Sequence, residues 1–351
     1  MKVAYSNLKI FNYKDKLDSL DTQEIKSPIH IRIKPTNICN HRCWYCAYRQ
    51  DNLQLGKDMV LSDFIPEQKM MEIIDDIVNM KVRAVTFSGG GDPFCYPFLC
   101  QAVKQLAKTE IKFAALTNGG RLYGEVANVF AHYATWVRVS MDGWDDESYS
   151  YYRNVGYGEY TKVVSNMESF KKLGGNCYLG VSLIIDQTNA THIYESTERL
   201  KNIGVDSIKM SPCVTNDIGK DNDTYHLPIF DTVRKQIEMS IDKLASPTFE
   251  IYDSYHKLAE KYEKDYTWCP YLQILTVIGA DQNIYACQDK AYNKAGLLGS
   301  LKEKRFKDVW FESKDKFFKI NPSVDCNHHC LSNNKNKLVL EYLNAEHLEF
   351  V

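Results

Sequence analysis

The chain has 351 residues, of which 44% are hydrophobic and 25% are charged. This length exceeds the size at which a single core keeps growing, so we expect one large domain and one small one. The formal net charge is −2, with basic and acidic residues interspersed, which makes nucleic acids and anionic membrane surfaces poor candidate partners.

The hydrophobic segments and the cysteines both bear on where the protein works. No stretch reaches the roughly 18 apolar residues that a membrane helix needs. Residues 1–20 lack the apolar core of a secretory signal. Eleven cysteines without an export signal are typical of metal ligands and reduced thiols rather than of a disulfide framework. We therefore expect a cytoplasmic protein that does not contact membranes.

Secondary structure is predicted from the spacing of apolar residues. Residues 1–28 are polar and weakly patterned, and we interpret them as an N-terminal extension. After them, short runs of branched apolar residues alternate with segments that carry apolar residues at helical spacing. The predicted strands are 30–34, 82–87, 111–116, 136–141, 177–185 and 206–210. The predicted helices are 66–80, 98–108, 123–133, 160–173, 192–203 and 228–244.

This alternation predicts the fold class of the larger domain, residues 29–245. Strands that alternate with helices at this period form a parallel sheet with right-handed crossovers. The domain is therefore an α/β structure, either an open sheet or an incomplete barrel. In both cases ligands bind at the carboxyl ends of the strands.

The rhythm ends after the sixth strand, and the C-terminal third is organised differently. Residues 216–222 are predicted as a loop. Residues 246–335 are predicted as a small cysteine-rich unit with a hairpin formed by 272–278 and 283–287. Residues 336–351 are predicted as a C-terminal tail or helix.

The strongest motif lies directly after the first predicted strand. Cys39, Cys43 and Cys46 are spaced C-x3-C-x2-C. Several thiolates on one short loop suit an iron–sulfur cluster. A closed tetrahedral site needs four ligands, so three leave an open coordination position, which is where metal sites perform chemistry. The alternative is a zinc knuckle with His41 as the fourth ligand.

This loop, with the aromatic Tyr45 before its third cysteine, resembles the radical S-adenosylmethionine (SAM) superfamily. The resemblance implies a partial (β/α)6 TIM-like barrel and a [4Fe–4S] cluster held by Cys39, Cys43 and Cys46. SAM would bind the fourth iron and be cleaved reductively to a 5′-deoxyadenosyl radical, which abstracts a substrate hydrogen. An electron donor such as flavodoxin or ferredoxin is implied as a partner.

The glycine run after the second predicted strand resembles the GGE-type motif of the same superfamily. Gly89, Gly90, Gly91 and Asp92 would then bind the amino group of SAM through backbone carbonyls, and glycine permits that close approach. Asp92 stands where the motif usually has Glu, unless Gly91 is an insertion. The alternative is a sharp turn without a ligand.

Three polar residues match positions that often contact other parts of SAM. Asn118 follows the third strand and Ser140 ends the fourth, at positions that contact the ribose and methionine parts. Arg153 resembles an arginine that pairs with the carboxylate of SAM, a role that its bidentate fork suits. The alternatives are turn caps and a surface ion pair.

The C-terminal cysteines form a second candidate cluster site. Together with the stretch 296–301 and Val309-Trp310, they resemble the auxiliary-cluster domain called twitch, the shortened form of SPASM. The resemblance implies one auxiliary [4Fe–4S] cluster, whose full coordination suits electron transfer or structure. The alternative is a structural zinc site with four thiolates, or with three and His328 or His329. The implied cluster ligands are Cys269, Cys287, Cys326 and Cys330.

Cys213 follows the sixth strand and should face the same cavity as the first cluster. In twitch-bearing radical epimerases a lone cysteine returns a hydrogen atom to the substrate radical, so the resemblance implies this catalytic role for Cys213. The alternative is a buried cysteine that only packs. Residues 1–28 are too few for a peptide-recognition domain, which favours a carbohydrate-like or other polar metabolite as substrate. With Cys213 as hydrogen-atom donor, we expect epimerisation of that metabolite.

Other outcomes stay open at this point. The auxiliary cluster can instead accept an electron from the substrate radical in a dehydrogenation. A peptide is an alternative substrate to a small molecule. A protein of a different class, a non-catalytic iron–sulfur or zinc protein, is the remaining alternative.

Overall fold

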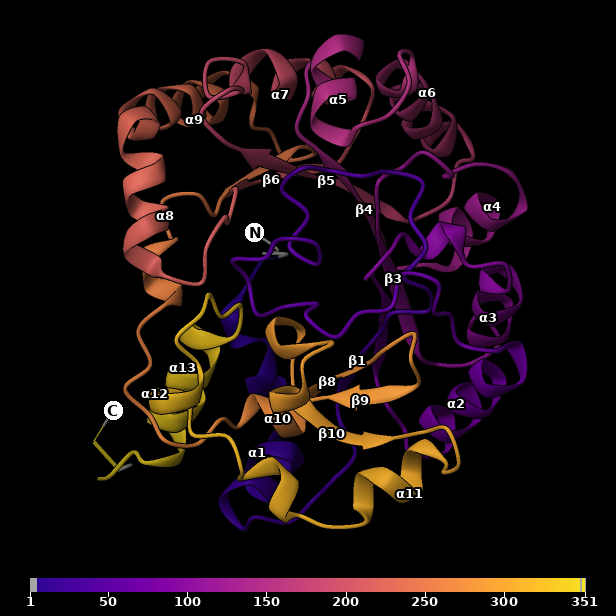
Figure 1. Ribbon diagram of the computed structural model, residues 1–351, viewed down its shortest axis with the longest axis vertical. Helices are drawn as coiled ribbons and strands as arrows, with labels where there is room; N and C mark the ends of the chain where they lie inside the picture. The colour runs from indigo at the N-terminus through magenta and orange to yellow at the C-terminus, as the bar shows by residue number, and fades with distance from the viewer. Residues whose placement is uncertain (1–4, 348, 351) are drawn as a thin grey trace.

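The computed structural model describes residues 5–347 and 349–350. Residues 1–4 of the predicted N-terminal extension, and 348 and 351 of the predicted tail, lie outside the described residues. The described strands form one ten-stranded sheet in the order β10-β9-β8-β1-β2-β3-β4-β5-β6-β7. The edge strands β7 and β10 do not pair with each other, so the sheet curves around a centre without closing (Figure 1).

Most of this sheet is parallel. Pairing is parallel from β8 through β1 to β7 and antiparallel between β8, β9 and β10. The predicted partial α/β barrel is therefore confirmed. The strands are β1 (His30–Ile33), β2 (Ala84–Phe87), β3 (Lys112–Thr117), β4 (Trp136–Met141), β5 (Tyr178–Ile185), β6 (Ser207–Pro212), β7 (Glu250–Asp253), β8 (Leu275–Ile278), β9 (Asn283–Tyr285) and β10 (Leu297–Ser300).

The predicted helices cover the outside of the curved sheet (Figure 1). In the first of them the apolar residues recur at helical spacing and are all buried, namely Met70, Ile73, Ile74 and Ile77. This spacing gives one apolar stripe, which packs on the sheet. The helices are α2 (Glu67–Asn79), α3 (Leu99–Leu106), α4 (Gly124–Tyr133), α6 (Glu159–Lys172), α7 (Ile193–Asn202) and α9 (Phe230–Leu244).

Several elements were not predicted. Residues 216–222, predicted as a loop, run into a helix that begins at Gly219, and the strand β7 follows the last barrel helix. The weakly patterned N-terminal residues contain a 3-10 turn (Asn7–Asn12) and a helix. The additional helices are α1 (Lys14–Asp21), α5 (Asp146–Arg153), α8 (Gly219–His226), α10 (Tyr271–Ile274), α11 (Phe306–Phe311) and α12 (Pro322–Asp325). Of the predicted strand 272–278, residues 272–274 belong instead to α10. The helix α13 (Asn333–Leu343) overlaps the predicted C-terminal tail or helix.

The sheet has an apolar outer face and a polar inner face. Along β1, Ile31 and Ile33 are buried in the core beneath the helices. Because side chains alternate along a strand, His30 and Arg32 point to the inner face. There His30 Nε2 lies 2.8 Å from the Thr86 hydroxyl of β2. The interior of the barrel is therefore lined by polar side chains.

The C-terminal unit continues the barrel sheet. β8 pairs with β1 in parallel, from His30 opposite Leu275 to Ile33 opposite Ile278. On the outside, α11 packs against α2, and the buried indole of Trp310 donates to the Lys26 carbonyl at 3.2 Å.

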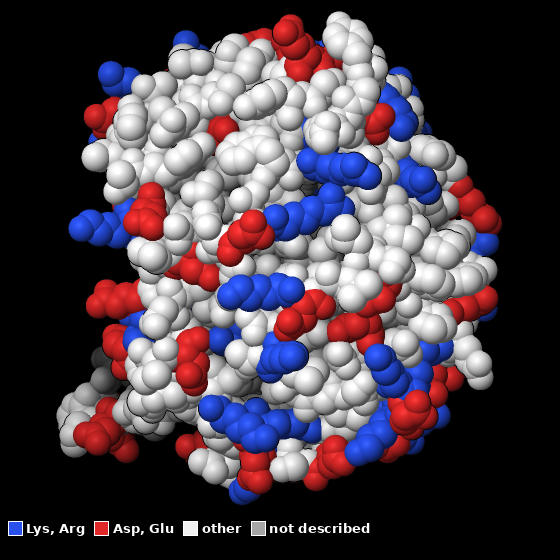
Figure 2. All heavy atoms as spheres, in the orientation of Figure 1, with Lys and Arg blue, Asp and Glu red and all other residues white. Residues whose placement is uncertain are grey.

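The outer surface carries both signs of charge. On the face that Figure 1 presents, Lys and Arg lie among Asp and Glu (Figure 2). Within the part of the chain that the structure describes, no helix is both long enough and apolar enough to cross a bilayer.

Trp310 provides a test of how the C-terminal unit is attached. We predict that Trp310→Ala lowers the free energy of unfolding by about 3–5 kcal/mol, because it empties a fully packed site between α11 and the N-terminal residues. The measurement is denaturant unfolding of the reconstituted protein. The control is Phe311→Ala, the next residue, which is 49% exposed and should cost less than about 1 kcal/mol. Equal losses for the two variants would contradict this packing role.

Candidate active site at the carboxyl ends of the strands

The three-cysteine loop follows β1 at the carboxyl end of the sheet. Cys39, Cys43 and Cys46 are all half-buried. The loop has little regular structure of its own and is held by α5. The N–H groups of Arg42 and Trp44 donate to carbonyls at the end of α5, at 2.8 and 3.2 Å. The position of the thiols therefore depends on that helix.

His41, the fourth ligand of the zinc alternative, is turned toward α6. Its Nε2 lies 3.3 Å from Glu159 Oε1. Its backbone N–H, rather than its ring, faces Cys39, at 3.4 Å from the sulfur. The geometry of the loop thus gives His41 a partner outside the cysteine set.

The glycine run after β2 lies against the same loop. The N–H of Asp92 donates to the Ile38 carbonyl at 3.0 Å. A Cβ at Gly90 would overlap Asn37 Oδ1, and one at Gly91 would overlap the Ile38 carbonyl oxygen. Only glycine allows this approach. The run therefore fixes the backbone just before Cys39.

The Asp92 side chain points into the protein. Its carboxylate accepts hydrogen bonds from the N–H of Phe94 at 2.9 Å, the hydroxyl of Thr117 at 2.9 Å and the N–H of Asn118 at 2.6 Å. Burial raises the pKa of this carboxyl, although these hydrogen bonds oppose the shift. The carboxylate thus joins the glycine run to the end of β3.

The ends of β3 and β4 bring two more of the predicted residues to this edge. Asn118 Nδ2 donates to Asn40 Oδ1 at 2.9 Å and lies 3.7 Å from the Cys39 sulfur. Ser140 is next to last in β4, opposite Ser182 of β5. Asn118 therefore contacts the cysteine loop, whereas Ser140 lies farther along the sheet.

Arg153 and Tyr45 meet at a carboxylate that was not predicted, Asp142. Arg153 Nε lies 2.8 Å from Asp142 Oδ2, with 3% and 0% of the two side chains exposed. The Tyr45 hydroxyl also donates to this oxygen. Burial alone would lower the pKa of Arg153, but Asp142 and the Cys43 thiol raise it, so the guanidinium stays charged.

A second nitrogen of Arg153 lies against the cysteine loop. Nη1 lies 3.5 Å from the Cys43 sulfur. Nη2 is buried and has no hydrogen-bond partner among the described residues. A buried unpartnered donor costs about 1–3 kcal/mol. An anionic or carbonyl acceptor beside Cys43 would satisfy it.

Lys34, the residue after β1, also belongs to this site and was not predicted. Its Nζ donates to the Gly89 carbonyl at 2.8 Å and to Gln288 Oε1 at 3.0 Å, and also to the Tyr48 hydroxyl. Burial lowers the pKa of Lys34 well below its usual value. This side chain links the glycine run to the residue after Cys287.

Cys213 directly follows β6 and is buried, with 1% of its surface exposed. Its N–H donates to the Ile185 carbonyl, and its carbonyl accepts from His226 Nε2, both at 2.8 Å. Burial raises the pKa of the thiol, and Asp186 and Asp142 raise it further. At neutral pH Cys213 therefore keeps its hydrogen.

The C-terminal cysteines line one enclosed cavity of about 60 Å³. Burial raises the pKa of the Cys287 thiol, followed by the effect of Asp289 and then of the other three thiols. Thiols that influence one another across a single cavity are a donor set that suits an iron–sulfur cluster. The four are Cys269, Cys287, Cys326 and Cys330.

A histidine bears on the zinc alternative at this cavity. His328 lines the cavity and His329 does not. His328 Nε2 is buried without a hydrogen-bond partner in the described part of the chain. Among the described residues, no three His, Cys, Asp or Glu side chains gather closely enough to hold a single metal ion.

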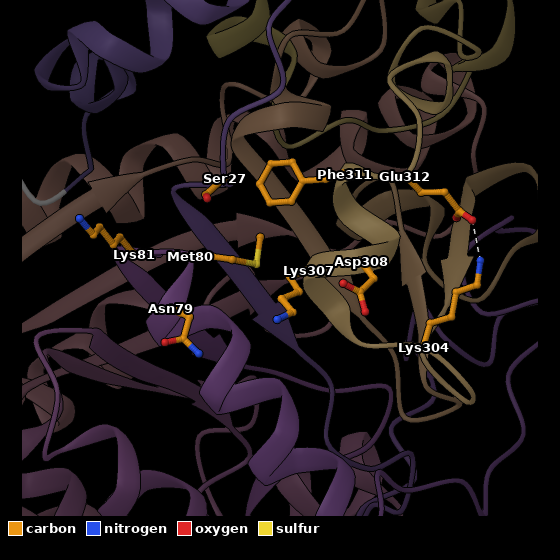
Figure 3. A pocket seen from close by; sticks show the side chains of 9 residues that line it. All are labelled: Ser27, Asn79, Met80, Lys81, Lys304, Lys307, Asp308, Phe311 and Glu312. Atoms are coloured by element: carbon orange, nitrogen blue, oxygen red, sulfur yellow. Dashed lines mark hydrogen bonds and ion pairs between the residues drawn. The ribbon is translucent and has the colours of Figure 1, made fainter.

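A hollow of about 840 Å³ lies away from all of these cysteines, between the end of α2 and α11 (Figure 3). Met80, Lys81, Lys307 and Phe311 are among its lining residues. None of the lining residues is a cysteine or a predicted site residue. The large volume of this hollow therefore does not identify it as the active site.

Part of the chain is similar in sequence to known proteins. Residues 33–195 match the Radical SAM superfamily. An S-adenosylmethionine-dependent nucleotide dehydratase of Lacinutrix mariniflava is 30% identical over 112 residues, which cover 31% of this chain and 22% of the relative. One of Psychrobacter lutiphocae is 25% identical over 169 residues, 44% of this chain and 55% of the relative. The chain thus spans about half the length of the second relative and less of the first.

Solved structures share the fold at low sequence identity. SuiB of Streptococcus suis bound to S-adenosylmethionine is 14% identical, with a TM-score of 0.62 over 89% of this chain and 72% of SuiB. Native anSMEcpe with bound AdoMet is 17% identical, with a TM-score of 0.58 over 90% of this chain and 96% of that protein. Residues 33–195 of this chain thus carry the sequence pattern of the Radical SAM superfamily, on a fold that the chain shares with these two structures.

Proposed function

We propose that Cys39, Cys43 and Cys46 hold the catalytic [4Fe–4S] cluster and that SAM binds beside it, at the ends of β2, β3 and β4. The unpartnered Nη2 of Arg153 next to Cys43 is an observation that supports this assignment. The close approach of Gly90 and Gly91 to Asn37 and Ile38 holds the glycine run against the cysteine loop and supports it as well. When bound, the cluster and SAM supply the radical that takes a hydrogen atom from the substrate.

Each surrounding residue has a role in this proposal. Arg153 pairs with the carboxylate of SAM, because its guanidinium is charged and has a free N–H. Asp142 and the Tyr45 hydroxyl orient Arg153. Asn118 and Ser140 contact the ribose and methionine parts. The Asp92 carboxylate already accepts hydrogen bonds from groups within the protein. We therefore propose that it positions the glycine run and does not contact SAM.

We assign residues 246–335 to a twitch-like unit whose four cysteines hold one auxiliary [4Fe–4S] cluster. The shared cavity supports this assignment. Four thiolates complete the coordination of such a cluster, which suits electron transfer rather than substrate binding. Lys34 and Gln288 connect this cavity to the SAM-binding loops.

The favoured reaction is epimerisation of a carbohydrate-like or other polar metabolite, with Cys213 as hydrogen-atom donor. The observation that carries it is the buried, protonated thiol at the same end of the sheet as the cysteine loop. The Cys213 S–H bond breaks as a C–H bond forms on the substrate radical. The sulfur radical left behind needs one electron and one proton, and a flavodoxin or ferredoxin would supply that electron.

A second candidate is oxidation of the substrate radical with the auxiliary cluster as electron acceptor. In that reaction the radical loses one electron and one proton, and Cys213 takes no part. The substrate class also has alternatives. The curated relatives are named for nucleotide dehydratase and GTP 3′,8-cyclase activities, and one SuiB structure holds the precursor peptide SuiA.

Substitution of Cys213 separates the two reactions. We predict that Cys213→Ala still forms 5′-deoxyadenosine when substrate is present but loses the product. In D2O the wild-type product should carry one solvent-derived deuterium, because the thiol exchanges with solvent. The control is Cys177→Ala, a buried cysteine just before β5 at the opposite end of the sheet. Unchanged product from Cys213→Ala would rule out hydrogen donation by this residue.

Iron content tests the two cluster sites. After anaerobic reconstitution we expect about eight irons per chain. Cys269→Ala should keep about four of them, because only the auxiliary site loses a ligand. A triple alanine variant of Cys39, Cys43 and Cys46 should lose the other cluster together with all SAM cleavage. Bound zinc without SAM cleavage would contradict the proposal.

The glycine run provides a finer test of the first site. We predict that Gly91→Ala lowers the iron bound at the three-cysteine loop by half or more, because its Cβ overlaps the Ile38 carbonyl and displaces Cys39. Iron analysis and the electron paramagnetic resonance signal of the reduced cluster measure the loss. Gly156→Ala is the matched control, since no atom lies within 4 Å of its Cβ position. Full iron in Gly91→Ala would show that the loop does not depend on this approach.

A further inference from the structure

The interior of the barrel carries cations from strands that are not neighbours in the sheet. Arg32 lies on β1, Arg138 on β4 and Lys209 on β6. Each stands between two strand residues that are buried in the apolar core beneath the helices, so its own side chain points inward. These flanking residues are Ile31, Ile33, Val137, Val139, Ile208 and Met210.

Other elements add two more cations to the same interior. The pKa of Lys209 is lowered to about 7, first by burial and then by the charges of Arg138, Lys261, Lys335 and Arg32. Lys335 belongs to α13 and Lys261 to the 3-10 turn 259–261. Each of these four charges therefore acts on Lys209.

None of the five forms an ion pair with a carboxylate within 4.0 Å among the described residues. Asp289 is the carboxylate that acts on Arg32 and Lys261 at longer range. The near partners are neutral. Arg32 Nη1 donates to Gln288 Oε1 at 3.3 Å, and Arg138 Nη2 to the Tyr5 hydroxyl at 2.8 Å.

The two arginines also keep unused donors. The Nε atoms of Arg32 and Arg138 are buried without a hydrogen-bond partner in the described part of the chain. An uncompensated buried charge destabilises a protein. The arrangement is therefore favourable only when something negative enters the interior.

The auxiliary cavity accounts for part of this charge. Arg32 and Lys335 line that cavity, where they would offset the negative charge of a thiolate-bound cluster. Arg138 and Lys209 do not line it. They lie on β4 and β6, on either side of β5. The auxiliary cavity therefore leaves these two cations without a negative charge beside them among the described residues.

We propose that the barrel interior binds a phosphorylated or nucleotide-activated small molecule, with Arg138 and Lys209 contacting the phosphoryl oxygens. This substrate class is narrower than the polar metabolite of the proposed function. The inference rests on the proposed function for the role of Cys213 at the reacting carbon. Lys209 precedes Cys213 by four residues on one strand, a separation of about 13 Å at the usual rise. That length suits a sugar nucleotide or sugar phosphate whose carbon reaches Cys213 and is too long for inorganic phosphate alone.

Binding of inorganic tripolyphosphate to the reconstituted enzyme tests this site without knowledge of the substrate. Isothermal titration calorimetry should give an affinity that falls by roughly 10- to 100-fold in Lys209→Met and in Arg138→Met, because each loses a charge-assisted hydrogen bond. Lys172→Met, an exposed lysine at the end of α6, is the matched control and should bind as the wild type does.

Thermal unfolding provides a second readout. Tripolyphosphate should raise the Tm of the wild type and of Lys172→Met but not of Lys209→Met. Without the anion, Lys209→Met should be at least as stable as the wild type, since it removes a half-buried charge that has no ion pair among the described residues. This keeps loss of binding distinct from loss of folding.

The outcomes also separate this inference from the proposed function. A wild-type enzyme that cleaves SAM and does not bind tripolyphosphate would overturn the inference and leave the proposed function in place. Equal binding by all variants would overturn it too. Binding lost only in the two interior variants would support it, even if SAM cleavage failed and the proposed function fell.

Discussion

The buried ion pair between Asp142 and Arg153 is the interaction on which the site depends. Two charges out of water are costly, and such a pair persists only when its remaining atoms find partners. Asp142 Oδ1 accepts from the Gly143 N–H at 2.8 Å, and its carbonyl accepts from Asn189 Nδ2 at 2.9 Å. The pair locks α5 to the end of β4. The cysteine loop donates two backbone hydrogen bonds to carbonyls of α5. The position of the loop therefore depends on this ion pair.

Lys34 connects the same site to the C-terminal unit. It lies at the junction of β1 with the loop, and its ammonium group joins a carbonyl of the glycine run to Gln288, beside Cys287. β1 is also the strand to which the C-terminal unit adds β8. β1 therefore leads into the three-cysteine loop at its carboxyl end and pairs with the C-terminal unit along one edge. A shift of either set is transmitted through rigid backbone rather than through a flexible linker.

The sequence predicted the barrel well because its strands and outer helices have simple apolar periods. It missed α5, whose residues carry no apolar stripe and which is stabilised by a capping box between Asp145 and Ser148. That box was the available signal. The cysteines were visible from spacing alone. Asp142 was not, because its role arises only when β4 and α5 fold together. Neither Arg138 nor Lys209 is singled out by the sequence, because only the curvature of the folded sheet turns their side chains toward a common interior.

That inward polar face distinguishes this sheet. Parallel strands covered on both sides usually read as continuous apolar runs. Here β1, β4 and β6 each carry one basic residue among their inward-facing positions, namely Arg32, Arg138 and Lys209, although nothing polar is needed to hold such a sheet together. The chain as a whole is slightly acidic, with a net charge of −2, yet its interior is basic. Basic residues in the barrel interior are partly removed from water, and this desolvation lowers the stability of the protein without a ligand. A bound anionic ligand explains why these basic residues are present, because its negative charge would offset the desolvation of the cations and contribute to binding.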